Sequence, residues 1–434
     1  MKKNYSYIKF GDFAEIQPMV KIGRDTQCGF IPMEVINPGY KYVYPIEEKK
    51  YDGSGVKFEN NDIIFARITP CLEHGKIAVV KGLNDNKGFG SSEYYVFRER
   101  KEVSTRDYIY YLAISPLIKG NAIVSMVGAS GRQRAQKDVI EKTVVKVPDL
   151  PTQKKVSLIL SAYDDLIDTN RRRMQLLEET ARLLFREWFV YFRFPRLSQG
   201  FGGQAGHEKA CPVESRNSTG VKIVDGVPEG WEKGPIKKYY DTTSGGTPSR
   251  EHPEYYQGDI NWVKTQELDE KYIFDTEERV TQEAISKSSA KIFPANTLLV
   301  SIYGNANIGR TGILAKPAAS NQACVAFFPK KPYFHFIYLQ QYLQMIRDYL
   351  VGMSQGAAQT NISQDTLRKV NILMPDELFM NKFLKIAEPL YEQIKNLQYQ
   401  NQKLAHARDL LLPRLMSGAI DPVRYDKLSN GVEA

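Results

Sequence analysis

The sequence predicts a mixed α+β fold, in which two α/β domains repeat in tandem and two long helices pair as a coiled coil. Three observations support this prediction. The two halves of the 434-residue chain resemble each other block by block, each half ends in a long segment with an apolar period of 3.5 residues, and a glycine-rich stretch separates the halves. The proportions of hydrophobic (42%) and charged (25%) residues are those of a globular protein, so each domain can bury a core.

The repeat is visible as similar blocks at matching places in the two halves. Residues 107–112 resemble residues 335–340 at an offset of 228, and upstream residues 62–65 resemble residues 297–300 at a larger offset. Gly75 and Lys76 likewise resemble Gly309 and Arg310. The change of offset indicates that the loops differ in length between the halves.

Both halves show the same succession of elements. Short apolar runs, such as residues 63–65 and 298–300, predict buried strands because they are rich in residues that favour extended backbone. Residues 108–114 and 337–346 predict helices. Between the halves, residues 198–206 are rich in glycine, which is typical of a linker. The predicted segments are 1–150 for the first domain, 151–193 for the first long helix, 194–230 for the linker, 231–375 for the second domain, 376–418 for the second long helix and 419–434 for a tail.

Each long helix carries a seam of positions spaced alternately four and three residues apart. Nine of ten seam residues in the first helix and eight of ten in the second are apolar. This pattern and the matched register favour a mutual coiled coil over two unrelated amphipathic helices, and each seam would run ~48 Å at ~1.5 Å per residue. The seams are Val156, Leu160, Tyr163, Ile167, Asn170, Met174, Leu177, Ala181, Leu184 and Trp188, and then Phe383, Ala387, Leu390, Ile394, Leu397, Asn401, Leu404, Arg408, Leu411 and Leu415.

Charge and cysteine usage narrow the class of protein. The formal net charge of +9 and the pI of about 9.0 favour an anionic partner such as the phosphate backbone of DNA, although a basic protein without such a partner fits the charge equally well. The four cysteines (Cys28, Cys71, Cys211 and Cys324) are too far apart to resemble paired zinc ligands. With no signal peptide and no apolar run of ~20 residues, we expect a cytoplasmic protein with reduced thiols.

We find no catalytic or cofactor-binding motif in the sequence. Residues 37–40 (Asn-Pro-Gly-Tyr) lack the second proline of an adenine methyltransferase motif, and the glycines of residues 200–206 lie in the linker rather than after a strand. No phosphate-binding Gly-Lys-Ser/Thr loop occurs, and the five histidines show no metal-ligand spacing. We therefore expect no metal site and no catalytic residues.

Several blocks resemble a known family in an order that occurs twice. Five segments are similar to blocks of the specificity subunits of type I restriction-modification systems. They are residues 66–76 in the first half, residues 227–232, 244–249 and 255–263 in the second half, and residues 410–418 at the end of the second helix. The first half lacks the Pro-Glu-Gly-Trp sequence that leads into the second domain, so the start of the first domain is less well defined.

The resemblance implies a non-catalytic DNA-specificity subunit. Each of two target-recognition domains would read one half of a bipartite, asymmetric DNA target, and the two helices would pack antiparallel as a spacer. Two modification subunits would bind the chain and methylate adenine, and two restriction subunits could join them, so that S-adenosylmethionine, ATP and Mg would be needed only in the partners. The alternatives are a recognition subunit of another multi-subunit methylation or phage-defence system, an enzyme that carries its own recognition domains, and a purely structural coiled-coil scaffold.

Candidate DNA-reading residues are polar side chains on predicted loops and helix ends, because such donors and acceptors match base edges. A solvated loop, an ion pair for Arg67, and turn chemistry around Lys264 and Gln266 remain alternatives, as does a solvated face for the arginine run 171–173. The candidates are Arg67, Thr69, Lys76, Arg132, Gln133, Arg134 and Lys137 in the first domain, and Lys264, Gln266, Tyr303, Asn305, Arg310, Gln355, Gln359, Thr360 and Asn361 in the second.

The seams hold one asparagine each, Asn170 and Asn401. The repeat offset of 227 places Asn401 at the equivalent of position 174, and positions 170 and 174 are equidistant from the seam's centre at 172. In an antiparallel pair with twofold pseudo-symmetry the two amides would therefore meet and satisfy each other. Buried asparagines of this kind fix the register of a coiled coil; the alternative is that both face solvent.

Overall fold

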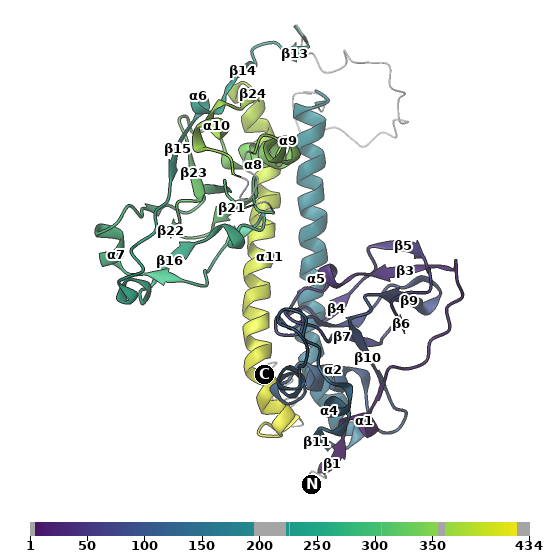
Figure 1. Ribbon diagram of the computed structural model, residues 1–434. Helices are drawn as coiled ribbons and strands as arrows, with labels where there is room; N and C mark the ends of the chain where they lie inside the picture. Colours follow the sequence, from purple (N-terminus) through teal and green to yellow (C-terminus); the bar gives the residue numbers. More distant parts are fainter. Residues whose placement is uncertain (1–4, 195–222, 225, 305, 355–360, 423–434) are drawn as a thin grey trace, which may run out of the picture. The chain divides into compact units, whose positions relative to one another are not determined.

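The computed structural model describes residues 5–194, 223–224, 226–304, 306–354 and 361–422 (Figure 1). The chain divides into two compact units, residues 1–172 with 400–434, and residues 173–399. The long helices α5 (Leu150–Phe189) and α11 (Glu377–Ser417) begin within one residue of their predicted starts, and α5 ends before the predicted residue 193. The division falls within both helices, so each unit combines one α/β domain with half of each long helix.

The described residues of the first unit form three sheets. The five-stranded sheet has the order β2 (Ala14–Ile16), β10 (Tyr94–Glu99), β7 (Ile63–Ala66), β8 (Ile77–Val80) and β4 (Tyr42–Val43). The four-stranded sheet has the order β5 (Glu47–Lys50), β3 (Gln27–Ile31), β9 (Lys87–Gly90) and β6 (Val56–Glu59), and β1 (Tyr5–Lys9) pairs with β11 (Val144–Pro148). The helices of this domain are α1 (Phe10–Phe13), α2 (Arg106–Ala113), α3 (Asn121–Val124) and α4 (Lys137–Lys142).

The second unit repeats this plan. Its five-stranded sheet has the order β15 (Tyr240–Ser244), β23 (Cys324–Pro329), β20 (Leu298–Ser301), β21 (Thr311–Leu314) and β17 (Tyr272–Ile273). The four-stranded sheet has the order β18 (Arg279–Val280), β16 (Ile260–Val263), β22 (Ala318–Ser320) and β19 (Ile292–Phe293), β14 (Glu232–Pro235) pairs with β24 (Asn371–Met374), and β12 (Ile223–Val224) pairs with β13 (Val227–Pro228). The helices are α6 (Ile236–Tyr239), α7 (Gln282–Ser286), α8 (Phe336–Met345), α9 (Arg347–Gly352) and α10 (Gln364–Lys369).

The central strands explain the continuous apolar runs in the sequence. In β7, Ile63 and Phe65 enter the core shared with the helices, whereas Ile64 enters a second core against the four-stranded sheet. In β20, Leu298 and Leu299 divide between two cores in the same way. A strand that is buried on both faces needs apolar residues at every position rather than at alternate ones. The predicted strands and helices of both halves are confirmed.

The structure corrects one detail of the repeat. Helices α2 and α8 begin at Arg106 and Phe336, and strands β10 and β23 begin at Tyr94 and Cys324. Both comparisons give an offset of 230 in this region, so the alignment of residues 107–112 with 335–340 is shifted by two residues. The sequence favours the wrong register because residues 108–110 (Tyr-Ile-Tyr) resemble residues 336–338 (Phe-Ile-Tyr) more closely than residues 338–340 (Tyr-Leu-Gln).

Within each unit the two long helices pack antiparallel. In the first unit, Val156 and Leu160 of α5 share a core with Leu415 of α11, and in the second, the ring of Trp188 in α5 lies tilted against that of Phe383 in α11, with 6.1 Å between ring centres. All twenty predicted seam positions are buried or half-buried. The 3.5-residue pattern therefore identified the packed faces of both helices.

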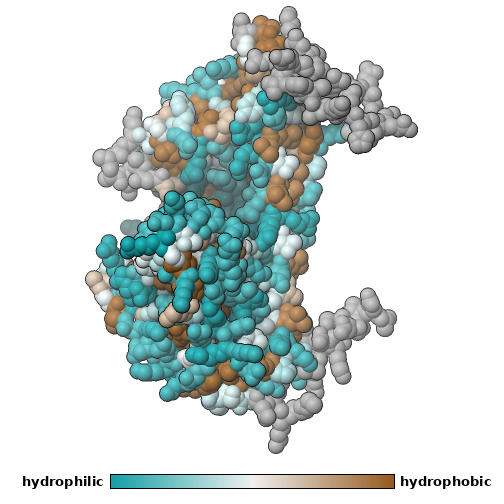
Figure 2. Space-filling view, turned by 90° about the vertical axis from the view of Figure 1, so that its right-hand side faces the viewer, coloured by the Kyte–Doolittle hydropathy of each residue, from teal (hydrophilic) through white to brown (hydrophobic). Residues whose placement is uncertain are grey.

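The surface of the first unit is mostly polar on the face that Figure 2 turns toward the viewer. Hydrophilic residues cover most of it, and apolar residues occur there in small patches. All four residues of strand β5, Glu47–Lys50, are exposed. This face is suited to solvent or to a polar partner rather than to burial in a protein core.

Candidate nucleic-acid interface

Three chain segments meet where strand β7 ends in the first unit. The backbone N–H of Arg67, just after β7, donates to the carbonyl of Glu93, just before β10, at 3.0 Å. The N–H of Ala135 donates to the carbonyl of Arg67 at 2.8 Å, and that of Thr69 donates to the carbonyl of Gln133 at 3.0 Å. The predicted reading loop around residues 130–137 is thereby fixed beside the end of the central strand. We call this meeting point the first loop junction.

A carboxylate joins two of the predicted arginines at the first loop junction. Arg134 donates from Nε and Nη2 to Glu93, with the shortest contact 2.7 Å from Nη2 to Oε1. Arg67 donates from Nε to Oε2 of the same carboxylate at 3.1 Å, and its guanidinium lies 5.5 Å from the ring centre of Tyr95. The hydrogen bonds from Arg134 and Arg67 hold the pKa of Glu93 below its ordinary value, in spite of partial burial. The cluster carries one net positive charge.

The second unit builds an equivalent junction from different side chains. The N–H of Ile302 donates to the carbonyl of Ala323 at 3.0 Å, and the N–H of Ile362 donates to the carbonyl of Ile302 at 3.0 Å. Tyr303 forms an isolated β-bridge with Asn361, as Ile68 does with Arg134 in the first unit. The backbone contacts thus make Ile302, Ala323 and Asn361 the counterparts of Arg67, Glu93 and Arg134. The second loop junction has the same frame without the charged cluster.

The other candidates of the first domain fall into two groups. Thr69 contacts the carbonyl of Gln133 with its hydroxyl at 3.3 Å, and Lys76 donates to the carbonyl of Met33 at 2.8 Å, so both side chains stabilise the local fold. Arg132 is exposed, Gln133 is half-buried, and Lys137 is exposed and pairs with Glu141 one helical turn away. A DNA contact by these residues stays a prediction.

The candidates of the second domain are similarly divided. Lys264 lies between Glu277 and Glu278 at 2.7 and 2.9 Å, and Gln266 donates to Glu277 at 3.3 Å. Tyr303 and Asn361 are exposed at the second loop junction, and Arg310 is half-buried. Four candidates, Asn305, Gln355, Gln359 and Thr360, lie outside the described residues.

The sequence did not indicate Glu93 as part of the site. Glu93 is 26 residues from Arg67 and 41 residues from Arg134, and a single glutamate has no motif. One signal was nevertheless present. If the apolar runs 63–66 and 94–97 pair as antiparallel strands, Glu93 before the second run lies beside Arg67 after the first, because one strand ends where the other begins.

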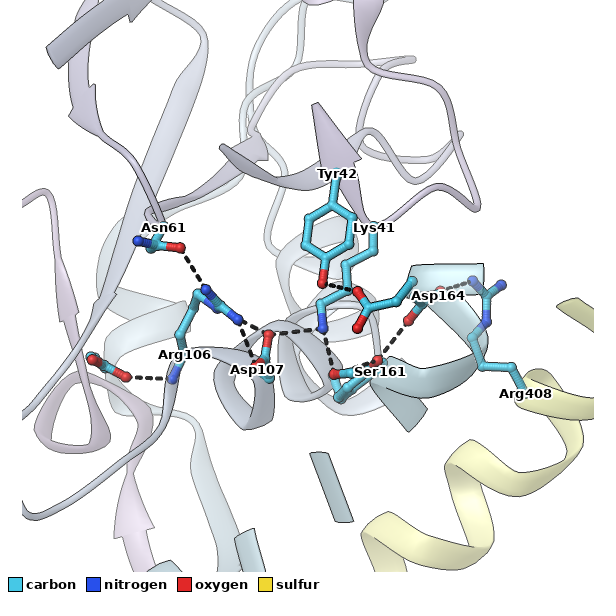
Figure 3. Close-up of polar contacts among 11 residues, drawn as sticks. Lys41, Tyr42, Asn61, Arg106, Asp107, Ser161, Asp164 and Arg408 are labelled. Atoms are coloured by element: carbon cyan, nitrogen blue, oxygen red, sulfur yellow. Dashed lines mark hydrogen bonds and ion pairs between the residues drawn. The ribbon is translucent and has the colours of Figure 1, made fainter. Parts of the chain in front are cut away.

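A buried polar network attaches the first domain to its helix halves (Figure 3). Lys41, which is fully buried, donates to Asp107 at 2.8 Å and to Ser161 of α5 at 2.6 Å. Asp164 of α5 accepts from Tyr111 at 2.6 Å and from Arg408 of α11 at 2.5 Å, with only 1% and 5% of the Asp164 and Arg408 side chains exposed. Burial lowers the pKa of Lys41 and raises that of Asp164. In the sequence, Arg408 is one of the two polar residues in the seam of the second helix, and nothing there indicates its partners.

The arginine run of α5 begins in this region too. Arg171 pairs with Asp168 at 2.8 Å and lies 5.1 Å from the ring centre of Tyr40. Arg172 pairs with the same aspartate at 3.1 Å and lies 4.3 Å from the ring of Tyr44. Both arginines therefore contact the domain, which neither the solvated nor the phosphate-binding interpretation predicted.

The contact expected between the seam asparagines is present. Asn170 donates from Nδ2 to Oδ1 of Asn401 at 3.0 Å, and both residues are buried. The return bond differs from the expectation, because Nδ2 of Asn401 donates to the backbone carbonyl of Ile167 at 3.1 Å. Both amides are held, although not by a reciprocal pair.

In the part of the chain that the structure describes, no group of three or more His, Cys, Asp or Glu side chains is placed to hold a metal ion. In the same residues, no helix is both long and apolar enough to cross a membrane.

The chain is similar to known proteins over nearly its whole length. Residues 2–179 and 228–405 each match the family described as "Type I restriction modification DNA specificity domain". The specificity subunit of the type I restriction enzyme HindI from Haemophilus influenzae is 26% identical over 89% of this chain and 93% of its own length. The MjaIX specificity subunit from Methanocaldococcus jannaschii is 23% identical over 96% of this chain and 94% of its own.

A solved structure shares the fold. The crystal structure of the type I restriction-modification S subunit from M. genitalium has a TM-score of 0.54, with 12% sequence identity, over 95% of this chain and 96% of that one.

Proposed function

This chain belongs to the type I restriction-modification DNA specificity family, and from this membership we propose that its two recognition domains each read one half of a bipartite, asymmetric DNA target. The chain is a specificity subunit with two such domains. In this proposal, each domain reads its half-site with the loop junction at the end of its central strand.

The observation that carries the proposal is the repeated loop junction with exchanged side chains. The same backbone hydrogen bonds recur around Arg67 and Ile302, so the frame is duplicated. The side chains on that frame change from a charged cluster to Tyr303 and Asn361. A frame that is kept while its polar groups differ suits two readers of different base sequences, because bases are distinguished by the pattern of donors and acceptors.

The partners follow from the class of complex. We propose that two adenine methyltransferase subunits dock on this chain, that restriction subunits can join them, and that all catalysis takes place in the partners. S-adenosylmethionine, ATP and Mg would then be needed only there. Helix α5 exposes large apolar side chains that suit such docking, since exposed apolar surface often marks protein contacts. They are Leu158, Leu166, Leu176 and Leu183.

The long helices would set the distance between the two half-sites. Each domain packs on its own halves of α5 and α11, through the buried network in the first unit and through aromatic residues such as Phe185 and Trp188 in the second. A domain anchored to a helix by buried groups cannot slide along it without leaving charges or cavities behind. The length of helix between the two positions at which the domains are attached would therefore determine the number of base pairs between the half-sites.

A domain exchange tests the division of labour. Residues 1–150 would be replaced by the corresponding domain of a relative with a known target, in the chain expressed with its modification subunits. We expect the methylated motif, mapped across the host genome, to change in one half-site only. The reciprocal exchange of residues 231–375 is the matched control and should change the other half. A change of both half-sites in either hybrid would refute independent reading.

A further inference from the structure

Glu93 accepts hydrogen bonds from one edge of the Arg134 guanidinium and leaves another edge largely unpaired. A guanidinium carries five N–H donors in a fixed plane. Arg134 directs Nε and Nη2 to the two oxygens of Glu93, which fills one edge of that plane. The adjoining edge, formed by Nη1 and the second N–H of Nη2, has one long contact, 3.4 Å from Nη1 to the carbonyl of Arg132. Glu93 thus fixes the direction in which a second fork of donors points.

This second fork lies on an accessible side chain with a rigid support. The Arg134 side chain is 44% exposed, whereas that of Glu93 is 19% exposed and is held from its other side by Arg67. Arg67 in turn lies over the ring of Tyr95, whose hydroxyl donates to the carbonyl of Ala135 at 2.8 Å. A long side chain normally loses rotamer freedom when it binds a ligand, and here part of that loss has already occurred in the folded chain.

We propose that Arg134 reads a guanine in one half-site and that Glu93 is the positioning residue that aims it, an inference that rests on the proposed function. Two parallel donors from one guanidinium match the O6 and N7 acceptors on the major-groove edge of guanine. Arg134 was among the candidates that the sequence indicated, whereas Glu93 was not.

The carboxylate also decides between a base and a phosphate as the ligand. A phosphate group accepts from an arginine fork equally well, but Glu93, 2.7 Å from Arg134, offsets one of the two guanidinium charges and so weakens the attraction of the cluster for a phosphate. The edge of guanine carries no net charge, so its binding depends less on that attraction. Arg132, which is exposed on the same loop, is better suited to a phosphate.

The second domain lacks a pair equivalent to Glu93 and Arg134. The counterparts of Glu93 and Arg134 are Ala323 and Asn361, so that junction has neither the carboxylate nor the fork. Asparagine pairs with the N6 and N7 edge of adenine rather than with guanine. The proposal therefore concerns one half-site only.

The test replaces Arg134→Ala in the full chain, expressed with its modification subunits, and maps adenine methylation across the host genome. We expect one G·C position in one half-site to become degenerate, with the other half-site unchanged. Binding of the assembled complex to a duplex with the wild-type target should weaken by about 10- to 100-fold. Glu93→Gln should relax the same position less strongly, because it leaves the arginine in place but removes the charge that orients it.

Three results would overturn the proposal. They are weaker binding with an unaltered motif, which would indicate a phosphate contact; no change at all; and relaxation at a position that is not G·C. Arg132→Ala is the matched control, since it removes the same charge from the same loop and should weaken binding without altering the motif. If Arg134→Ala fails to assemble, Arg134→Lys decides, because it keeps the charge but lacks the fork. Failure of the proposed function would be separate, because the wild-type complex itself would then show no bipartite motif.

Discussion

The two units attach their domains to the same pair of helices by opposite chemistry. In the first unit, the contact is made by buried charges, with Asp164 of α5 bonded to Arg408 of α11 and to Tyr111 of the domain. At an offset of 227, which relates the starts of α5 and α11, Asp164 corresponds to Tyr391 and Arg408 to Ala181.

The corresponding contact in the second unit carries no ion pair between the helices. Tyr391 accepts a hydrogen bond from Gln341 of the domain at 2.8 Å, and Ala181 leaves room for it in an aromatic core. An ionic interface has thus been exchanged for a neutral one with no change in backbone plan. The fold therefore fixes where each domain contacts the helices, while the side chains at that contact differ between the units.

The largest effect should come from removing one half of the buried ion pair. Arg408→Ala leaves the Asp164 carboxylate buried beside a hydrophobic seam, which should lower the free energy of unfolding of the first unit by about 3–5 kcal/mol. Urea unfolding, with hydrogen exchange followed separately in peptides of each unit, would measure it. The second unit should keep its protection.

Two variants sharpen this result. Arg414→Ala, at an exposed position of the same helix, should change stability by less than about 0.5 kcal/mol. Replacing both partners, Asp164→Leu with Arg408→Met, should recover part of the loss, because no charge is then left unpaired. The recovery stays partial because Tyr111 and the carbonyl of Gly39 also lose their bonds. A double variant as unstable as Arg408→Ala would contradict the assignment of the loss to an uncompensated charge.

A smaller difference between the units should appear as pH dependence. The equivalent helices α2 and α8 follow Thr105 and His335, and only His335 caps its helix with its side chain, accepting from the N–H of Ile337. Burial lowers the pKa of His335 to about 4, against the opposing influence of Glu388 at 3.4 Å. Below pH ~6.5, His335 becomes protonated in the unfolded chain, whereas in the folded chain it stays neutral until about pH 4. The free energy of unfolding therefore falls as the pH falls through this window.

The expected loss for the second unit is about 2–3 kcal/mol between pH 7 and pH 4. His335→Asn retains an acceptor at the cap but does not titrate, and it should remove this part of the pH dependence. Denaturant unfolding of both proteins at several pH values would show it. Parallel curves for the variant and the wild type would mean that folding does not shift the pKa of His335.

The smallest effect concerns the asparagine contact. Asn170→Leu deprives Oδ1 of Asn401 of its donor in a buried position and should cost about 1–3 kcal/mol. Replacing both residues by leucine should restore stability and allow the helices to shift, so that the mapped target shows more than one spacing between its half-sites. A double-mutant cycle without coupling, or a target of unchanged spacing, would exclude a role in register.

Much of the architecture was predictable because it depends on patterns that repeat along the chain. The apolar seams predicted both long helices and the meeting of Asn170 with Asn401, since a periodic pattern fixes a helical face and pseudo-symmetry fixes its partner. The return bond to Ile167 was not predictable, because side-chain rotamers depend on local packing that no period encodes.

The polar clusters were less accessible to sequence reasoning. Lys41 is buried and contacts residues 66 and 120 positions away, although a lone lysine is normally exposed. Arg67 and Arg134 were identified as candidates, yet their shared carboxylate became apparent only from the pairing of β7 with β10. Contacts of this kind depend on which loops the sheet brings together, and the loops themselves carry little pattern.

The discontinuity of the first unit has a consequence for synthesis on the ribosome. The second unit is one continuous stretch, residues 173–399, whereas the first needs residues from 400 onward to complete its helix pair. The first unit, whose recognition domain is translated first, is therefore completed only after the second unit has been translated. Until Arg408 has emerged, Asp164 has no cation from α11, and a nascent or truncated chain carries an open apolar seam that chaperones and proteases can recognise. The ion pair between Asp164 and Arg408 can therefore form only after the second recognition domain has been translated.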